Sequence, residues 1–441
     1  MPEPGEVAPA RGRLGPIALT ALVIGNMVGS GVFLLPSTLA PYGGASVLGW
    51  AVSAVGSMLL GLALARLARR RPAAGGPYAY TRDAFGEFAG FQVGWGYWIS
   101  CWTGVAALAI ATVGYLGDLV PAVLASPFAA SATAIGAIVL LCAINVSGVR
   151  RAGGVQVVTV VLKLLPLFAI AVFGFARFEP EHFRPFNPSP LPLFGAVQAC
   201  LAQTLWAFTG FESASVAAGE ARNPERDVPR ATLLGIGLAT VLYVVCTVAV
   251  MGLVPREVLV NSNAPFADAA RELWGSSAGK LVAAVAFVSC FGALNGWILV
   301  SGRMPLAIAR DGLFPRFFQR LSRSGTPAQG LVLSCALACA MVVANTSGSL
   351  VAMYNAMIVL ATLSALVPLV FAAMAEALVS LRERRAGAAS ATAGIVIGFA
   401  AFGYGLLVVG GAGHVYVYWG FLLILSGLPF YVVARARPPA G

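Results

Sequence analysis

Charge is scarce in this chain of 441 residues, of which 10% are charged and 59% are hydrophobic. Soluble proteins carry about 25% charged residues, so this composition excludes an ordinary soluble domain. The formal net charge of +11 could suggest a nucleic-acid partner, but almost all of it is arginine in short segments between apolar runs. That placement is typical of membrane topology. We therefore expect a polytopic membrane protein whose partner is the lipid bilayer, with no nucleic-acid partner.

Residues suited to catalysis or metal binding are scarce as well. The two histidines, His182 and His414, lie at the edges of apolar runs, and the seven cysteines lie inside such runs without any pair at metal-ligand spacing. We interpret the cysteines as small apolar residues. The sequence contains no phosphate-binding loop and no nucleophile–base pair. We expect no enzymatic activity, no catalytic residue, no bound metal and no cofactor.

Long apolar runs dominate what is present. A membrane-spanning helix needs about 20 apolar residues, and the runs predict an all-helical fold with twelve transmembrane helices. We expect these spans, numbered 1 to 12 in chain order, near residues 16–37, 45–66, 88–116, 128–147, 155–176, 193–218, 232–254, 280–302, 328–346, 350–376, 390–411 and 414–434. The loop at residues 303–327 contains apolar patches, and we expect short interfacial helices there.

The arginines predict the orientation of the spans. With the N-terminus inside, 22 arginines fall on the cytoplasmic side, whereas Arg177, Arg184, Arg256 and Arg271 fall outside. The positive-inside rule therefore supports an even number of spans and places both termini in the cytoplasm. Residues 1–13 contain no cleavable signal pattern. We expect a multi-pass protein of the cell inner membrane.

The first span contains a break. Residues 25–31 hold three glycines, Asn26 and Ser30, and each glycine inside a helix costs about 1 kcal/mol relative to alanine. In hydrocarbon such a break persists only where the freed backbone groups bind protein or a polar cavity. The pattern favours an unwound helix that turns backbone donors toward a ligand. Alternatively, Gly25 and Gly29 form a close helix-packing surface.

A second break lies in span 6, where residues 206–215 combine Gly210, hydroxyl side chains and Glu212. The two breaks occupy corresponding positions if spans 1–5 and 6–10 are inverted repeats, which is the best sequence indication of a transporter binding site. We therefore predict four parts of the chain. They are a cytoplasmic tail at 1–13, a first repeat at 14–190, a second repeat at 191–385, and spans 11 and 12 with the C-terminal tail at 386–441.

Several stretches carry a resemblance to a known family, and they run in the same order from span 1 to span 9. They are Gly25–Pro36, Gly75–Tyr80, Thr204–Trp206, Gly210–Gly219, Gly296–Trp297 and Asp311–Pro315. With them the chain resembles transporters of the amino acid–polyamine–organocation superfamily, most closely the bacterial basic amino acid/polyamine antiporters. The resemblance implies a LeuT-like five-plus-five inverted repeat with two further helices and alternating access around a central site.

The resemblance also implies how the site holds an amino acid. The substrate carboxylate would meet Ser30 and Gly31, where the second half-helix of span 1 begins and offers free N–H groups. The ammonium would meet carbonyls near Trp206 and Thr209, with Trp206 as a gate and Trp297 facing the substrate side chain. The predicted substrate-binding residues are Asn26, Gly29, Ser30, Gly31, Cys101, Val105, Trp206, Thr209, Trp297 and Val359.

Two of these positions differ from the arginine/agmatine antiporters of that family, which hold the guanidinium with an Asn in span 3 and a Ser in span 10. Here the matching residues are Val105 and Val359. A buried guanidinium would lack hydrogen-bond partners beside them, which is costly. The sequence favours a neutral or apolar amino acid, or a monoamine, over arginine. An arginine/agmatine-type antiporter is the alternative, and a transporter-like sensor that does not translocate is a remote one.

Three residues are candidates for coupling and gating. Lys163 in span 5 is one of two lysines, and a lysine at mid-span indicates function. The resemblance implies that its ammonium replaces the sodium ion of sodium-coupled relatives, facing carbonyls of span 1 and hydroxyls of span 8; snorkelling is the alternative. Glu212 is either a titrating group or a structural acid, and Tyr97 belongs to its network. Asn295 either lines the site or bonds a neighbouring helix.

The predicted function is a sodium-independent exchanger or proton-coupled permease, with protons and a second copy as open candidate partners.

Overall fold

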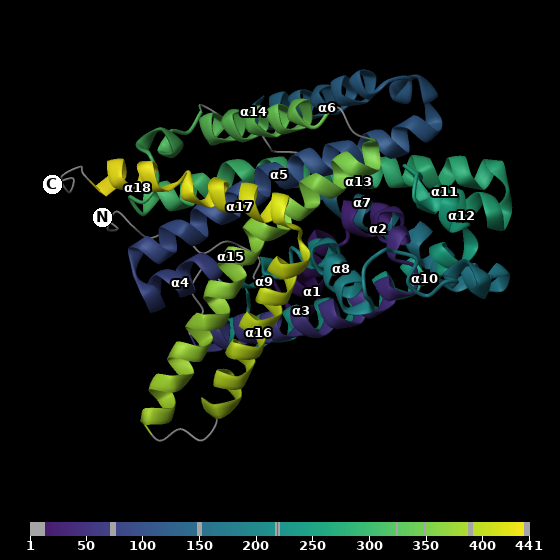
Figure 1. Cartoon of the computed structure of the whole chain (residues 1–441). Coiled ribbons are helices and arrows are strands. Elements are labelled where there is room, and N and C mark those ends of the chain that lie inside the picture. The colour runs from purple at the N-terminus through teal and green to yellow at the C-terminus, as the bar shows by residue number, and fades with distance from the viewer. Residues whose placement is uncertain are drawn as a thin grey trace.

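The computed structural model describes residues 14–70, 76–147, 152–216, 218, 221–322, 325–346, 349–386 and 391–435. The side chains of Ser30, Val216 and residues 152–162 lie outside this description, as does the predicted tail at 1–13. Over the described residues the protein is almost entirely helical, and its only β-type pairing is an isolated bridge between Leu14 and Ala221. Figure 1 shows the helices gathered in one bundle.

The long helices follow the predicted spans closely. Those that correspond to spans 1 to 6 are α1 (Pro16–Met27) with α2 (Ser30–Leu39), α3 (Ala45–Arg70), α5 (Glu87–Leu119), α6 (Pro127–Ser147), α7 (Ala152–Phe173), and α8 (Leu193–Phe208) with α9 (Ser213–Val216). Those that correspond to spans 7 to 12 are α10 (Pro224–Leu253), α13 (Ser276–Arg310), α14 (Ala328–Ala344), α15 (Leu350–Arg385), α16 (Ala391–Gly411), and α17 (His414–Leu425) with α18 (Leu428–Arg435).

Short helices fill the connections between these elements. The α-helical ones are α4 (Pro77–Phe85), α11 (Arg256–Leu259) and α12 (Pro265–Trp274). The 3₁₀ turns are η1 (Ala40–Tyr42), η2 (Pro121–Leu124), η3 (Gly174–Arg177), η4 (Pro180–Phe183) and η6 (Arg316–Gln319).

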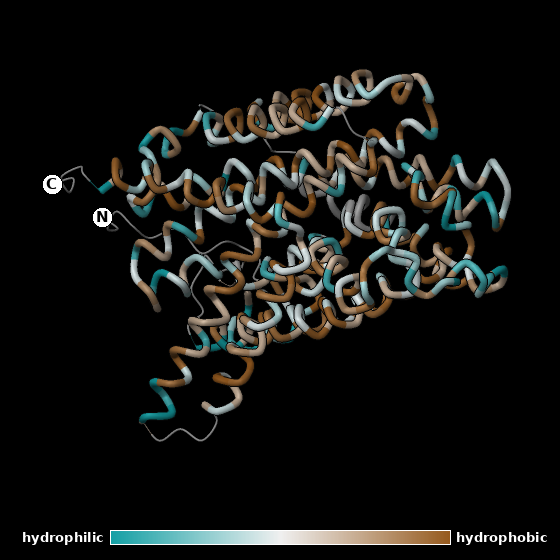
Figure 2. Tube along the Cα trace, viewed as in Figure 1, coloured by the Kyte–Doolittle hydropathy of each residue, from teal (hydrophilic) through white to brown (hydrophobic). Residues whose placement is uncertain are grey.

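The all-helical membrane fold is confirmed by the length and hydropathy of these elements. Within the described ranges, eight helices are long and apolar enough to cross a membrane, or nine if α1 and α2, bent by 41°, form one span. Figure 2 shows hydrophobic residues along the helices and hydrophilic residues gathered toward their ends. The count of twelve stays a prediction, partly because a broken span such as α8 with α9 contains no single helix of spanning length.

Several helices continue past the apolar runs that predicted them. The helix α13 extends to Arg310, so residues 303–310 continue span 8 and the prediction of short interfacial helices is wrong there. Similarly, α10 begins at Pro224, with Glu225 and Asp227 in its first turn. Proline and acidic residues favour a helix N-terminus. Apolar runs indicate the hydrocarbon-facing part of a helix, and polar turns extend it into water.

The helix α5 is the centre of the bundle. In its most apolar stretch, 94% of the residues are buried. The helix packs against α13 and α15. By contrast, α17 and α18 present exposed apolar side chains such as Trp419 and Val432 on the outside. The half-helix α2 packs against α8, α5 and α13, and α1 packs against α9. The two breaks therefore lie inside the bundle.

Candidate functional site

Both predicted helix breaks are present. The helix α1 ends at Met27, Val28 and Gly29 leave helical geometry, and α2 begins at Ser30. The helix α8 ends at Phe208, and a turn leads to α9 at Ser213. Each break interrupts the backbone hydrogen bonds of its helix, which leaves carbonyls free at one end and N–H groups free at the other.

The two breaks lie directly against each other. Gly210 has a φ of 112°, a conformation that favours glycine. A Cβ atom at Gly210 would lie 2.9 Å from the carbonyl carbon of Asn26 and 3.1 Å from the nitrogen of Met27. A Cβ atom at Gly31 would lie 2.8 Å from the Cα of Ala207. Two glycines that the sequence singled out thus let the backbones of the two half-helix pairs touch.

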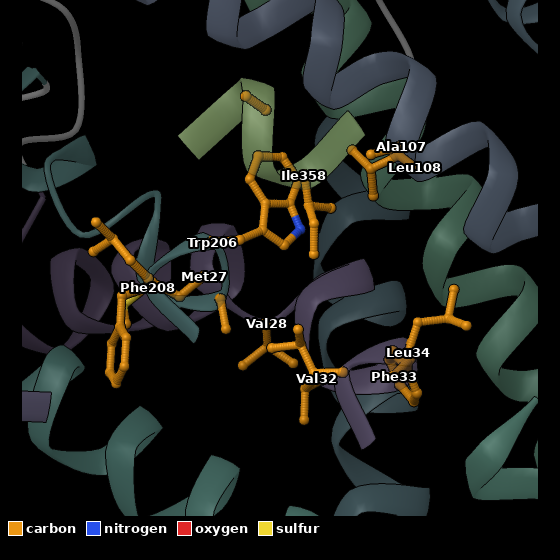
Figure 3. Close-up of a cluster of buried hydrophobic side chains, with 14 of the residues drawn as sticks. Met27, Val28, Val32, Phe33, Leu34, Ala107, Leu108, Trp206, Phe208 and Ile358 are labelled. Carbon is orange, nitrogen blue, oxygen red and sulfur yellow. The ribbon is translucent and has the colours of Figure 1, made fainter. Parts of the chain in front are cut away.

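A small cavity lies between the breaks. Its volume of about 10 Å³ is close to the least that holds one water molecule. Figure 3 shows the Trp206 indole beside Ile358, with Met27 and Val28 of the first break on one side and Leu108 on the other. An amino acid therefore needs a rearrangement of these walls before it can enter. The cavity is lined by Asn26, Met27, Gly29, Gly31, Leu108, Trp206, Thr209 and Trp297.

Six of the ten predicted substrate-binding residues line this cavity, and Met27 and Leu108, which were not predicted, line it as well. Cys101, Val105 and Val359 are buried but do not belong to its lining. The spacing of Cys101, Val105 and Leu108 sets all three on one side of α5. The backbone of Ser30 begins α2, while its side chain lies outside the described part.

Two tryptophans cover the cavity from different helices. The ring centroids of Trp206 on α8 and Trp297 on α13 are 5.8 Å apart, with an angle of 36° between the planes. A Cβ atom at Gly104 would lie 2.8 Å from Cη2 of Trp206 and 3.5 Å from Cε3 of Trp297. Gly104 of α5 therefore makes room for both rings. Gly104 is one of several glycines in α5, so the sequence alone did not distinguish it.

The carbonyls at the end of α8 differ in availability. The Trp206 oxygen accepts from the backbone N of Thr209 at 3.1 Å and from its Oγ1 at 2.6 Å, which uses both lone pairs of a carbonyl. Among the described residues, nothing donates to the Thr209 carbonyl. The predicted ammonium partner near Trp206 is thus already occupied, whereas the Thr209 carbonyl is a free acceptor among the described residues.

Tyr97 and Glu212, the predicted coupling residues, are hydrogen-bonded to each other. The Tyr97 hydroxyl donates to Oε1 of Glu212 at 3.0 Å, and the backbone N of Gly210 donates to Oε2 at 2.9 Å. Glu212 is 4% exposed. Its carboxyl therefore connects α5 to the break after α8, and both of its oxygens have donors.

Lys163 points into the protein and does not snorkel. Its Nζ donates to the Gly25 carbonyl at 2.5 Å, and the residue is 5% exposed. Gly25 lies in the last turn of α1, where carbonyls lack helical partners and the helix dipole favours a cation. The predicted carbonyl partner in span 1 is present. Of the predicted hydroxyls in span 8, Ser289 Oγ has no hydrogen-bond partner in the described part of the chain.

Two further polar side chains have structural partners away from the cavity. Asn145 Nδ2 on α6 donates to Asn295 Oδ1 on α13 at 2.7 Å, so Asn295 bonds a neighbouring helix, which was one of its two predicted roles. Glu376 on α15 is fully buried and pairs with Arg66 and Arg70 of α3.

Comparison with known proteins covers nearly the whole chain. The sequence model of the amino acid permease family matches residues 14–434. The putrescine transporter PotE of Escherichia coli (strain K12) is 31% identical over 426 residues, which cover 96% of this chain and 97% of that protein. The putrescine transporter PotE of Haemophilus influenzae is 30% identical over 420 residues, or 95% and 96% of the two chains. The cadaverine/lysine antiporter of Escherichia coli (strain K12) is 35% identical over 335 residues, or 76% and 75%.

Proposed function

The chain belongs to the amino acid permease family, and we propose that it is a sodium-independent transporter of neutral amino acids or their amines. Membership supports transport of amino acids or polyamines across a membrane. The observation that carries the finer proposal is the closed cavity between the two breaks, covered by Trp206 and Trp297. A site inside the bundle that needs a rearrangement to open suits alternating access.

The breaks offer the two groups that an amino-acid backbone needs. The N-terminus of α2 at Ser30 and Gly31 has free N–H groups and the positive end of a helix dipole, which attract a carboxylate. The Thr209 carbonyl, which is free at the negative end of α8, suits an ammonium. The two ends approach each other where Gly31 packs on Ala207. This arrangement supports recognition of the α-carboxylate and α-ammonium together.

The apolar side chains in and near the cavity support a neutral substrate. Val105 and Val359 are buried, Leu108 lines the cavity, and Ile358 lies beside Trp206 (Figure 3). The carboxyl of Glu212 already accepts from Tyr97 and Gly210. A cationic side chain in addition to the α-ammonium would therefore find no free carboxylate here, and burying an unpaired charge is costly.

Antiport of polyamines or basic amino acids is the second candidate. It is favoured by the relatives, which are described as a putrescine transporter and a cadaverine/lysine antiporter. The faces of Trp206 and Trp297 could also hold an amine, since aromatic faces attract cations. The two candidates differ in which compound drives exchange.

The test is counterflow in proteoliposomes loaded with one compound and supplied with a labelled one. We expect exchange of a labelled neutral amino acid against unlabelled neutral amino acids, with the same rate in sodium and in choline buffer. Excess arginine, agmatine, putrescine and cadaverine should compete weakly. Strong exchange of the diamines alone would replace the proposal by the second candidate. Binding in a thermal-shift screen without flux of any compound would support the sensor instead.

A further inference from the structure

An apolar groove opens on the outside of the bundle, away from the central cavity. It runs between α4, α15 and α16, and its volume of about 390 Å³ lies within the range of ligand pockets. Phe85 and Leu381 on its rim are 41% and 37% exposed. All of its lining side chains are apolar, and they include Phe85, Phe371, Met374, Leu378, Leu381 and Phe402.

Packed aromatic rings fix the shape of this groove. The rings of Phe85 on α4 and Phe371 on α15 meet edge to face, with centroids 6.0 Å apart and an angle of 82°. A groove with such walls and no polar side chain can hold hydrocarbon but cannot orient a polar ligand along its length. Its ligand therefore needs a polar group only at an end.

Free cations lie at one end of the groove. The last turn of α15 carries Arg382, Arg384 and Arg385, all of them exposed. Leu378, Leu381 and Arg385 are spaced three and four residues apart, so Arg385 follows the lining residues on the same face of the helix. None of the three arginines has an acidic partner within the described ranges.

We infer that this groove binds one acyl chain of an anionic phospholipid whose phosphate pairs with Arg385. The distribution of arginines assigns this end of α15 to the cytoplasmic side, where anionic lipids attract basic residues beside a membrane span. A guanidinium forms bidentate bonds with phosphate. The fully apolar lining accepts the chain, and the free charge beyond Leu381 accepts the headgroup.

Native mass spectrometry of the purified full-length protein tests the inference. We expect one dioleoylphosphatidylglycerol retained per chain, and much less dioleoylphosphatidylethanolamine. The variant Arg385→Gln should retain phosphatidylglycerol about fivefold less, which corresponds to the loss of one basic residue at the membrane surface. Arg384→Gln is the matched control, because it removes the same charge from another face of α15 and should retain lipid like the wild type. Inorganic phosphate should not compete.

A second pair of variants tests the groove itself. Met374→Trp fills the groove and should abolish retention of phosphatidylglycerol, whereas Val396→Trp on the exposed surface of α16 should not. Gel filtration and thermal unfolding verify that each variant is folded. Equal retention of both lipids by the wild type, or unchanged retention by Arg385→Gln, would overturn the inference. Dimers that form in place of lipid binding and disappear in Met374→Trp would assign the groove to a second copy.

Discussion

The ammonium of Lys163 on α7 donates a 2.5 Å hydrogen bond to the carbonyl of Gly25 in the last turn of α1. The bond exists because the break after Met27 leaves that carbonyl without a helical donor. A cation here stabilises the negative end of the half-helix. Lys163 therefore stabilises the first break through the end of α1, and it does not line the cavity between the breaks.

Replacing Lys163 with Met should reduce exchange in proteoliposomes roughly tenfold or more, since a charged hydrogen bond contributes about 1.5–3 kcal/mol. The protein should still purify as a folded species, because Met fills a similar volume. Lys280→Met is the control, since the only other lysine is exposed on α13 and should transport normally. Wild-type rates in Lys163→Met would remove the assigned role.

The bond between Tyr97 and Glu212 predicts coupled effects. Tyr97→Phe removes the donor of the 3.0 Å hydrogen bond, and Glu212→Gln replaces the accepting carboxylate with an amide. Each should slow exchange, and the double variant should be little slower than the worse single variant, because residues that interact are not additive. Tyr80→Phe is the control, since the buried Tyr80 hydroxyl has no partner in the described structure. Fully additive losses in exchange rate would show that the two residues act independently.

The sequence predicted the breaks because glycine, which is unfavourable inside a helix, is conspicuous in an apolar run. Asn26, Thr209 and Trp297 could be placed in one cavity through the family resemblance. The occupied carbonyl of Trp206 could not be foreseen, since it depends on the rotamer of Thr209. The pairing of Glu376 with Arg66 joins residues 310 positions apart, and only the packing of α3 on α15 brings them together.

The position of Gly104 predicts a specific loss of function. Gly104→Ala would place a Cβ atom 2.8 Å from Trp206 Cη2, and overpacking of this kind costs about 1–3 kcal/mol. We expect weaker substrate binding with a measurable leak in the absence of counter-substrate, because Trp206 can no longer close over the cavity. Proteoliposome efflux into buffer with and without substrate measures both effects.

The neighbouring glycine Gly296 supplies the control for this experiment. It lies beside Trp297, and a Cβ atom there would meet nothing within 4 Å. Gly296→Ala should therefore keep both affinity and strict exchange. A Gly104→Ala protein with wild-type affinity and no leak would show that the Trp206 ring tolerates the displacement.

The ion pairs around Glu376 predict a stability difference between two similar substitutions. The carboxyl of Glu376 is fully buried and accepts hydrogen bonds from Arg66 Nε at 2.5 Å and from Arg70. It also accepts from Ser380 Oγ, at 3.0 Å. A Cβ atom at Gly394 of α16 would lie 2.3 Å from Glu376 Oε1, so three helices enclose this group. Removing one partner of a fully buried ion pair costs about 3–5 kcal/mol, and the cost is smaller here because the Arg66 and Arg70 side chains are 27% and 22% exposed.

We therefore expect Glu376→Gln to lower the unfolding temperature in detergent by several degrees, since α3 and α15 lose a carboxylate shared by two guanidinium groups. Glu383→Gln changes the same chemical group on the same helix, but the Glu383 side chain is 35% exposed and pairs with Arg70 at 2.8 Å. Exposed pairs contribute about 0–1 kcal/mol, so this variant should unfold close to the wild type. Equal unfolding temperatures for the two variants would mean that water reaches Glu376 and screens its pairs as it does those of Glu383.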